Sequence, residues 1–222
     1  MVDPLLLGLD SVSAVLTAVV AVAFARLWRD TRDLLDLALA IGFALVALSF
    51  LLSGGIFGDL PASSLTLGLR ISVQVAGGLL LTSAYISLHR HGSVRLGLTF
   101  AWTVLLGAVL VTISYVFSLS EVRLPSLRAV EVVGNLALIP AFASCGFMSF
   151  SRTAGRPTLD WALVPAAFLS FAAENYTWLL SNLDPAGSLF PLPYLWRFMG
   201  IAFLLVAVGL PPRSRREPHA AA

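Results

Sequence analysis

Apolar residues run along this chain in seven long stretches, separated by short polar connections. A helix needs about 20 residues to cross the roughly 30 Å hydrocarbon core of a bilayer, and each stretch has about that length. The pattern predicts an all-α, polytopic membrane protein, a seven-transmembrane-helix bundle. Its expected spans lie at about 5–27, 34–54, 65–88, 96–119, 127–150, 159–182 and 191–210. A single domain over residues 1–211 holds them all, and residues 212–222 form a short tail.

Composition supports the membrane assignment. Hydrophobic residues make up 58% of the chain and charged residues 12%, with a mean hydropathy of +0.90. A soluble domain carries about twice that share of charged residues. All 14 basic residues are arginine. The one cysteine, Cys145, excludes an internal disulfide and a CxxC redox pair.

The arginines in the connections and the tail gather on one side of the predicted bundle. The first, third and fifth connections and the tail hold ten of them, whereas the opposite side has Arg123 and Arg128. The ten are Arg26, Arg29, Arg32, Arg90, Arg95, Arg152, Arg156, Arg213, Arg215 and Arg216. Since cytoplasmic loops are enriched in arginine, we expect the N-terminus outside and the C-terminus in the cytoplasm. The predicted location is the plasma membrane of a prokaryote, crossed several times.

Five ionisable residues interrupt the apolar spans. They are Asp10, Arg70, Glu131, Glu174 and Arg197. An ionisable group in a bilayer costs at least a few kcal/mol unless it is paired or hydrated. At about 1.5 Å of rise per residue, all five lie roughly 7–12 Å below the outer end of their helix. The sequence therefore predicts one charged layer in the outer half of the bundle, and no equivalent layer in the inner half.

Further polar residues share helical faces with these charges, at spacings of three or four. The candidate network, ligand-binding or structural, consists of Asp10, Arg70, Gln74, Glu131, Asn135, Glu174, Asn175 and Arg197. On the sixth span, Ser170, Glu174, Thr177 and Ser181 form one such face, which we expect to point inward. On the first span, small residues suited to close helix packing form a stripe. The stripe consists of Ser11, Ala14, Ala18, Ala21 and Ala25.

Two interpretations of the layer remain open at this point. It forms either a network of internal salt bridges that holds the bundle together or a polar pocket, open to the outside, for a small ligand or ion. Three acids face two arginines in the layer, so one carboxylate lacks an obvious partner. Glu174 is the candidate, because its own helix contains no arginine.

The charges also hint at an internal duplication. Asp10 and Glu131 each follow a proline by six residues, and Arg70 and Arg197 each lie about six residues into their spans. The first three spans would then match the last three, with the fourth as a linker. This is a 3+1+3 parallel repeat, with an axis along the membrane normal.

Two families resemble the chain in overall layout. Microbial rhodopsins are similar in having an arginine in the outer half of the third helix, as Arg70, and aromatic residues in the sixth, as Tyr176 and Trp178. They need a lysine in the seventh helix, which this chain lacks, so a retinal pigment is excluded. Small sugar transporters of the 3+1+3 type resemble it in repeat plan. They have prolines in helices of both repeats, whereas here Pro140 and Pro165 lie within the fifth and sixth spans and the first two spans have none.

No motif of catalysis appears: the chain has no HExxH, GxSxG or Walker loop. We therefore expect a non-enzymatic integral membrane protein, sensor-like or an accessory subunit, with a charged pocket in the outer half. The alternative is a small-solute or ion transporter with the 3+1+3 repeat, ranked second because the inner half lacks polar groups. We expect no cofactor, no metal and no nucleic acid. Expected partners are membrane lipids; a membrane-protein partner and a homo-oligomer both stay open, as does the small ligand.

Overall fold

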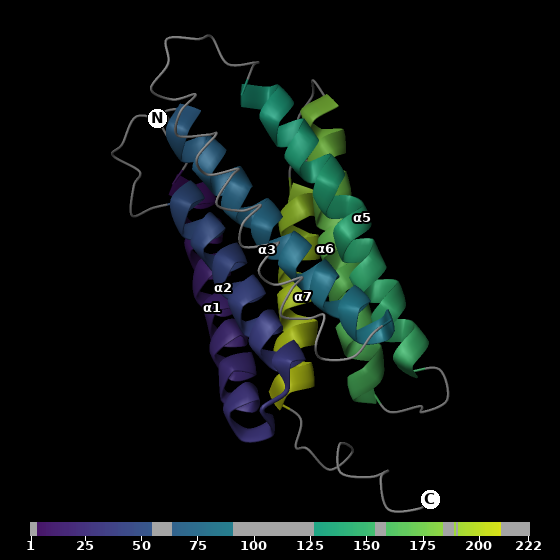
Figure 1. The fold of residues 1–222 in the computed structure, drawn as a ribbon. Coiled ribbons are helices and arrows are strands. Elements are labelled where there is room, and N and C mark those ends of the chain that lie inside the picture. Colours follow the sequence, from purple (N-terminus) through teal and green to yellow (C-terminus); the bar gives the residue numbers. More distant parts are fainter. Residues whose placement is uncertain are drawn as a thin grey trace, which may run out of the picture.

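The computed structural model describes residues 4–54, 64–90, 127–153, 159–183, 189 and 191–209, and this part of the chain is all-α. Figure 1 shows its six helices packed side by side along one common direction. The helices are α1 (Pro4–Thr31), α2 (Leu34–Gly54), α3 (Ser64–Arg90), α5 (Leu127–Thr153), α6 (Leu159–Leu183) and α7 (Pro191–Gly209).

These helices begin and end within four residues of six of the seven predicted spans. The seventh prediction, the span at 96–119, lies outside the described residues, so the seven-helix count is not established by them. Among the described residues, four segments are long and apolar enough to cross a membrane. They are Gly8–Thr31, Leu34–Leu52, Val132–Phe150 and Pro191–Gly209. The described part is therefore that of a membrane protein by helix length and composition.

Helices α3 and α6 are the other two described helices. The part of α3 whose side chains the structure describes, Leu69–Ala84, is apolar as well. Both helices carry several polar residues, including Gln74 in α3 and Asn175 in α6. Such residues are tolerated at membrane depth when they face other helices.

Each described helix contacts two others, so the six close into a ring in the order α1, α2, α3, α5, α6, α7. The contact between α7 and α1 that closes the ring is the smallest of the six. Helices α1, α3, α5 and α7 run in one direction and α2 and α6 in the other (Figure 1). The ring thus consists of two triplets, α1–α2–α3 and α5–α6–α7, that meet at two seams.

A two-residue turn joins α1 to α2. Arg32 takes a left-handed backbone conformation with φ of 58°. The next residue, Asp33, caps α2, because its Oδ1 accepts a hydrogen bond of 2.9 Å from the backbone N–H of Leu35. The Thr31 hydroxyl donates to the Asp36 carboxylate across the turn at 2.8 Å. These local bonds fix α1 and α2 as an antiparallel hairpin.

Five phenylalanine rings fill the middle of the ring. Phe43 of α2 stacks on Phe24 of α1 and on Phe168 of α6, with centroids 5.8 and 6.2 Å apart. Phe142 of α5 packs against Phe171 of α6 at 5.6 Å. All five side chains are buried. Although α2 and α6 are not neighbours in the ring, their aromatic side chains meet across its centre and join the two triplets.

Two pairs of helices approach closely at glycines, and the two approaches match. A Cβ on Gly77 of α3 would lie 2.9 Å from the carbonyl oxygen of Gly42 in α2. A Cβ on Gly200 of α7 would lie 3.1 Å from the carbonyl oxygen of Ala167 in α6. Ala167 follows Gly42 by 125 residues, and Gly200 follows Gly77 by 123. In each case a glycine of the third helix of a triplet lies against a backbone carbonyl of the second helix.

Candidate polar site

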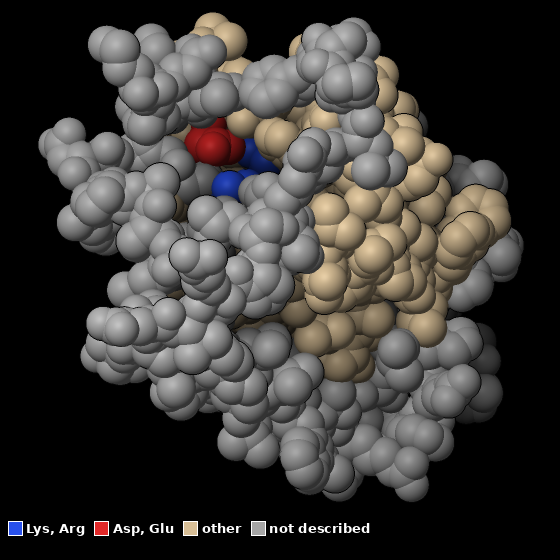
Figure 2. Space-filling view, turned by 90° about the horizontal axis from the view of Figure 1, so that it is seen from above, with Lys and Arg blue, Asp and Glu red and all other residues tan. Residues whose placement is uncertain are grey.

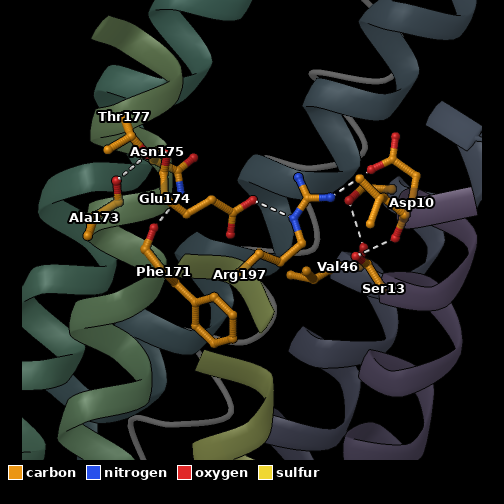
Figure 3. A network of polar contacts seen from close by, with 11 residues as sticks. Asp10, Ser13, Val46, Phe171, Ala173, Glu174, Asn175, Thr177 and Arg197 are labelled. Carbon is orange, nitrogen blue, oxygen red and sulfur yellow. Dashed lines mark hydrogen bonds and ion pairs between the residues drawn. The ribbon is translucent and has the colours of Figure 1, made fainter. Parts of the chain in front are cut away.

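One guanidinium group connects three helices near the end of the bundle at which α1 begins. Arg197 of α7 is only 1% exposed. Its Nε–H donates to Glu174 Oε1 of α6 at 2.7 Å, and its Nη1–H donates to Asp10 Oδ1 of α1 at 2.6 Å (Figure 3). Charge-assisted bonds of this length are the stronger class of hydrogen bond. Arg197 of α7 thereby links α6 to α1 across the contact between α7 and α1, which is the smallest of the ring.

Two aromatic rings cover the same guanidinium. Its central carbon lies 4.2 Å from the ring centroid of Phe50 in α2 and 4.9 Å from that of Tyr194 in α7. At these distances a cation is attracted to the face of the ring. Sequence reasoning missed both residues. Tyr194 was detectable, because it lies three positions before Arg197 on one helix, but Phe50 is one apolar residue in an apolar span and gave no signal.

The polar face of α6 points inward, as its spacing predicted. Ser170, Glu174 and Thr177 are buried, and Ser181, at the end of this face, is half-buried. The hydroxyl of Thr177 donates to the Ala173 carbonyl one turn earlier at 2.8 Å. Backbone carbonyls of the same helix accept hydrogen bonds from these hydroxyl groups, whereas the Glu174 carboxylate extends to Arg197 on the next helix, α7. Glu174 is thus the one charged residue of this face, and the other members are neutral.

The expectation that Glu174 lacks a partner is wrong. Its carboxylate is 3% exposed and binds Arg197 at 2.7 Å. The prediction considered arginines on the same helix only, whereas the partner comes from the next helix along the chain. Arg197 instead receives two carboxylates, because Glu174 and Asp10 bind different nitrogens of one planar group.

The predicted small-residue stripe of α1 is only partly correct. Ala14 and Ala21 are buried, but Ala18 and Ala25 are exposed. The inward face lies slightly to one side and consists of Asp10, Ser13, Ala14, Thr17, Val20, Ala21 and Phe24. Two contacts fix this rotation of the helix: the ion pair of Asp10 at one end and the stacking of Phe24 on Phe43 further along.

A small cavity lies beside Arg197, on the side of α3 and α5. Its volume is about 20 Å³, room for about one water molecule. The described residues lining it are Arg70, Ile71, Gln74, Gly134, Asn135, Leu138, Trp178 and Arg197. Three members of the predicted network, Arg70, Gln74 and Asn135, therefore surround one space together with Arg197. The charge of Arg70 also acts on Glu174.

Asn175 and Glu131 are the two remaining residues of the predicted network. Asn175 is buried, and its amide donates to the Phe171 carbonyl of its own helix at 2.7 Å. The side chain of Glu131 lies outside the described part; its position on α5 is one turn before Asn135. The structure thus brings Asp10 and Glu174 into direct contact with Arg197.

The polar site can be seen from one end of the molecule. Figure 2 views the bundle from the end at which α1 begins, and there acidic and basic atoms lie side by side in a recess. Within the described ranges, no three His, Cys, Asp or Glu residues are grouped as a metal site requires. Comparison of the chain with protein-family models, with curated proteins and with solved structures found no match.

Proposed function

We propose that this protein is a non-enzymatic, multi-pass membrane protein, sensor-like or an accessory subunit, whose outer-half pocket receives a small ligand. The observation that supports this most is the cavity beside Arg197, which is lined by hydrogen-bonding side chains from α3, α5, α6 and α7. The Arg197 guanidinium in this lining is held in place by Asp10 and Glu174 before any ligand binds. Such preorganised polar groups around a concave site favour binding.

The same proposal places the pocket on the outer side of a prokaryotic plasma membrane. Asp10 lies near the start of α1, whereas Arg26, Arg29 and Arg32 lie at its other end. Arginine-rich connections favour the cytoplasm, so the end that carries the polar site would face outward.

We further propose that a seventh span lies within residues 91–126, at the predicted position 96–119. Helix α3 ends and α5 begins at opposite ends of the bundle (Figure 1). The chain between them therefore has to return across the membrane, and a stretch of about 20 apolar residues is long enough to do so.

Thiol labelling in cells tests both the orientation and the access to the pocket. Single cysteines would be placed at Gly58, Gln74 and Gly155 in a Cys145→Ala background. We expect a membrane-impermeant thiol reagent to label Gly58→Cys from outside. Since the cavity has room for about one water molecule, access to Gln74→Cys would be tested with Ag⁺, a thiol-reactive ion of about that size, which should react more slowly. Gly155→Cys should react only after permeabilisation. The physical reason is that a charged reagent reaches only groups in contact with the outer solution.

A matched control is Ala172→Cys, a buried position of α6 outside the cavity lining, which should stay unlabelled throughout. Labelling of Gly155→Cys without permeabilisation would reverse the proposed orientation. A Gln74→Cys variant as silent as Ala172→Cys would contradict a pocket open to the outside.

A transporter is the second candidate, and one observation favours it. The matching close approaches of Gly42 to Gly77 and of Ala167 to Gly200 support two equivalent helix triplets. Transporters with parallel repeats place their substrate site between such halves. Against this stands the aromatic core around Phe43, which fills the centre of the ring.

Proteoliposomes distinguish the two candidates. They would be exposed to a panel of labelled small anions, cations and neutral solutes. The sensor-like function predicts uptake no faster than into empty liposomes for every solute, because the aromatic core fills the centre of the ring of described helices. Uptake that is lost in Glu174→Gln would instead establish transport, since this variant keeps the shape of the side chain and removes its charge.

A further inference from the structure

We infer that one side of α3, its outward face, is the docking surface for residues 96–119, which pack on it as a helix antiparallel to α3. This inference rests on the proposed seventh span and adds the surface that receives it.

The outward face of α3 lies opposite its contacts with the neighbouring helices. Gly77 approaches the Gly42 carbonyl of α2, and Gly78 approaches Leu138 of α5. Of the described helices, only α2 and α5 contact α3. A helix turns by about 100° per residue, so the side away from both glycines is formed by four other residues. They are Ser72, Ala76, Leu79 and Ser83.

Although no described helix lies against this outward face, it is covered. Ser72 and Ala76 are only 7% and 8% exposed, and Leu79 and Ser83 are half-buried. Within the described stretch Leu69–Ala84, no residue is exposed. A helix held by two neighbours on one side would expose its other side, so a further segment has to lie on α3.

Helix α7, the third helix of the other triplet, provides a comparison with an uncovered face. Counted from Gly200 instead of Gly77, the equivalent positions hold Leu195, Met199, Ala202 and Val206. Leu195 and Val206 are 54% and 49% exposed. Bulky apolar side chains of this kind suit contact with lipid, whereas serine and alanine suit close packing between membrane helices. The outward face of α3 therefore has the composition of a helix–helix interface.

The segment that follows α3 is the occupant that the chain favours. Between Arg90 and Leu127 lie residues 91–126, and a helix of about 20 residues leaves them only two short links. Such a helix lies beside α3 or beside α5, the two helices that it joins. On α5 the outward residues are each more than half exposed, namely Val133, Leu136, Phe147 and Phe150. The covered face of α3 is therefore the one that receives residues 96–119.

The sequence of residues 96–119 complements the outward face. In an antiparallel pair with residue 96 level with Arg90, each step back along α3 is a step forward along the partner helix. In this register Ser72, Ala76, Leu79 and Ser83 lie opposite Ser114, Leu110, Gly107 and Thr103, respectively. In the middle of the contact, each leucine thus meets a small residue. At both ends hydroxyl groups meet, where they can hydrogen-bond across the two helices.

This arrangement encloses the helix that supplies Arg70 and Gln74 to the cavity. With residues 96–119 on its outward face, α3 is held from three sides and does not border lipid. Helix α7, which supplies Arg197, keeps an exposed apolar face. The two walls of the cavity therefore differ in their surroundings.

Disulfide cross-linking of the full chain in membranes tests the docking surface, in a Cys145→Ala background. Two pairs should form a disulfide within one chain on mild oxidation: Leu79→Cys with Gly107→Cys, and Ser72→Cys with Ser114→Cys. A disulfide requires Cα atoms about 4.4–6.8 Å apart, which close packing of these helices provides. Trypsin cuts after Arg90 and Arg95, so the two cysteines fall on separate peptides that only the disulfide keeps together. Mass spectrometry detects the joined peptides.

The pair of Leu81→Cys with Gly107→Cys is the matched control. Leu81 lies two residues from Leu79 but packs against Gly42 of α2, on the other side of the helix. This pair should therefore give no joined peptides. Ala137, an exposed residue of α5, tests the alternative neighbour. A disulfide of Gly107→Cys with Ala137→Cys and not with Leu79→Cys would overturn the inference. A disulfide between two chains would also overturn it, and would assign the outward face to a second copy.

Thiol labelling of Ser93→Cys and Ser120→Cys separates this inference from the proposed seventh span. The span predicts that Ser120→Cys reacts from outside and that Ser93→Cys reacts only after permeabilisation. Labelling from opposite sides without a cross-link to α3 would contradict the docking surface alone. Labelling of both from the same side would contradict the span itself.

Discussion

Replacing Arg197 by alanine is expected to destabilise the protein by about 3–5 kcal/mol. The substitution leaves Glu174 and Asp10 buried without the cation that binds both of them. It also removes the partner of the Phe50 and Tyr194 rings. In a protein of this length the loss corresponds to a Tm lower by about 10 °C in detergent. Circular dichroism at rising temperature measures the effect directly.

The control is an arginine at the surface. Arg29 and its neighbour Asp30 are 75% and 71% exposed, and their charged atoms are 3.9 Å apart. Exposed pairs of this kind contribute little to stability, so Arg29→Ala should leave the Tm unchanged. If the two variants melted at the same temperature, the inward-facing network would lose its support.

Valine at Gly77 or at Gly200 is expected to destabilise the bundle by about 1–3 kcal/mol in each case. At Gly77 the new Cβ would stand 2.9 Å from the Gly42 carbonyl oxygen, which cannot move without moving α2. At Gly200 it would stand 2.8 Å from the Phe171 ring and 3.1 Å from the Ala167 carbonyl oxygen. Similar losses in both variants, measured as Tm in detergent, are what two equivalent triplets predict.

Gly8 is the matched control for these substitutions. It lies in α1, and a Cβ there would meet nothing within 4 Å. Gly8→Val should therefore leave the Tm close to that of the parent protein. Tolerance of valine at Gly77 alone, or a loss at Gly8 as large as at Gly200, would show that these approaches do not determine the packing.

The helices were predictable because the signal for a span is long and local. About 20 apolar residues between short polar connections leave few alternatives, and α2 matches its predicted span at both ends. The buried position of three of the five predicted charges, Asp10, Glu174 and Arg197, was predictable for a related reason. A carboxylate such as Asp10 or a guanidinium such as Arg197 stands out in an apolar span, and the cost of exposing it to lipid requires it to face inward.

The pairing inside the layer was not predictable from one chain. Which carboxylates reach Arg197 depends on the rotation of α1 and α6 and on which helices adjoin α7. Those are properties of the assembled ring, and no local spacing encodes them. The rotation of α1 shows this well: alanine at position 18 is as small as at position 14, yet only Ala14 is buried.

The central claim is that Asp10, Glu174 and Arg197 act as one buried unit. A thermodynamic cycle over Asp10→Asn, Glu174→Gln and Arg197→Met in detergent tests it most directly. We predict that Arg197→Met alone costs several kcal/mol, about 3–5, and that the triple variant regains most of this loss, because no charge is then left uncompensated. Losses that simply add up across the three substitutions would mean that the three side chains do not interact.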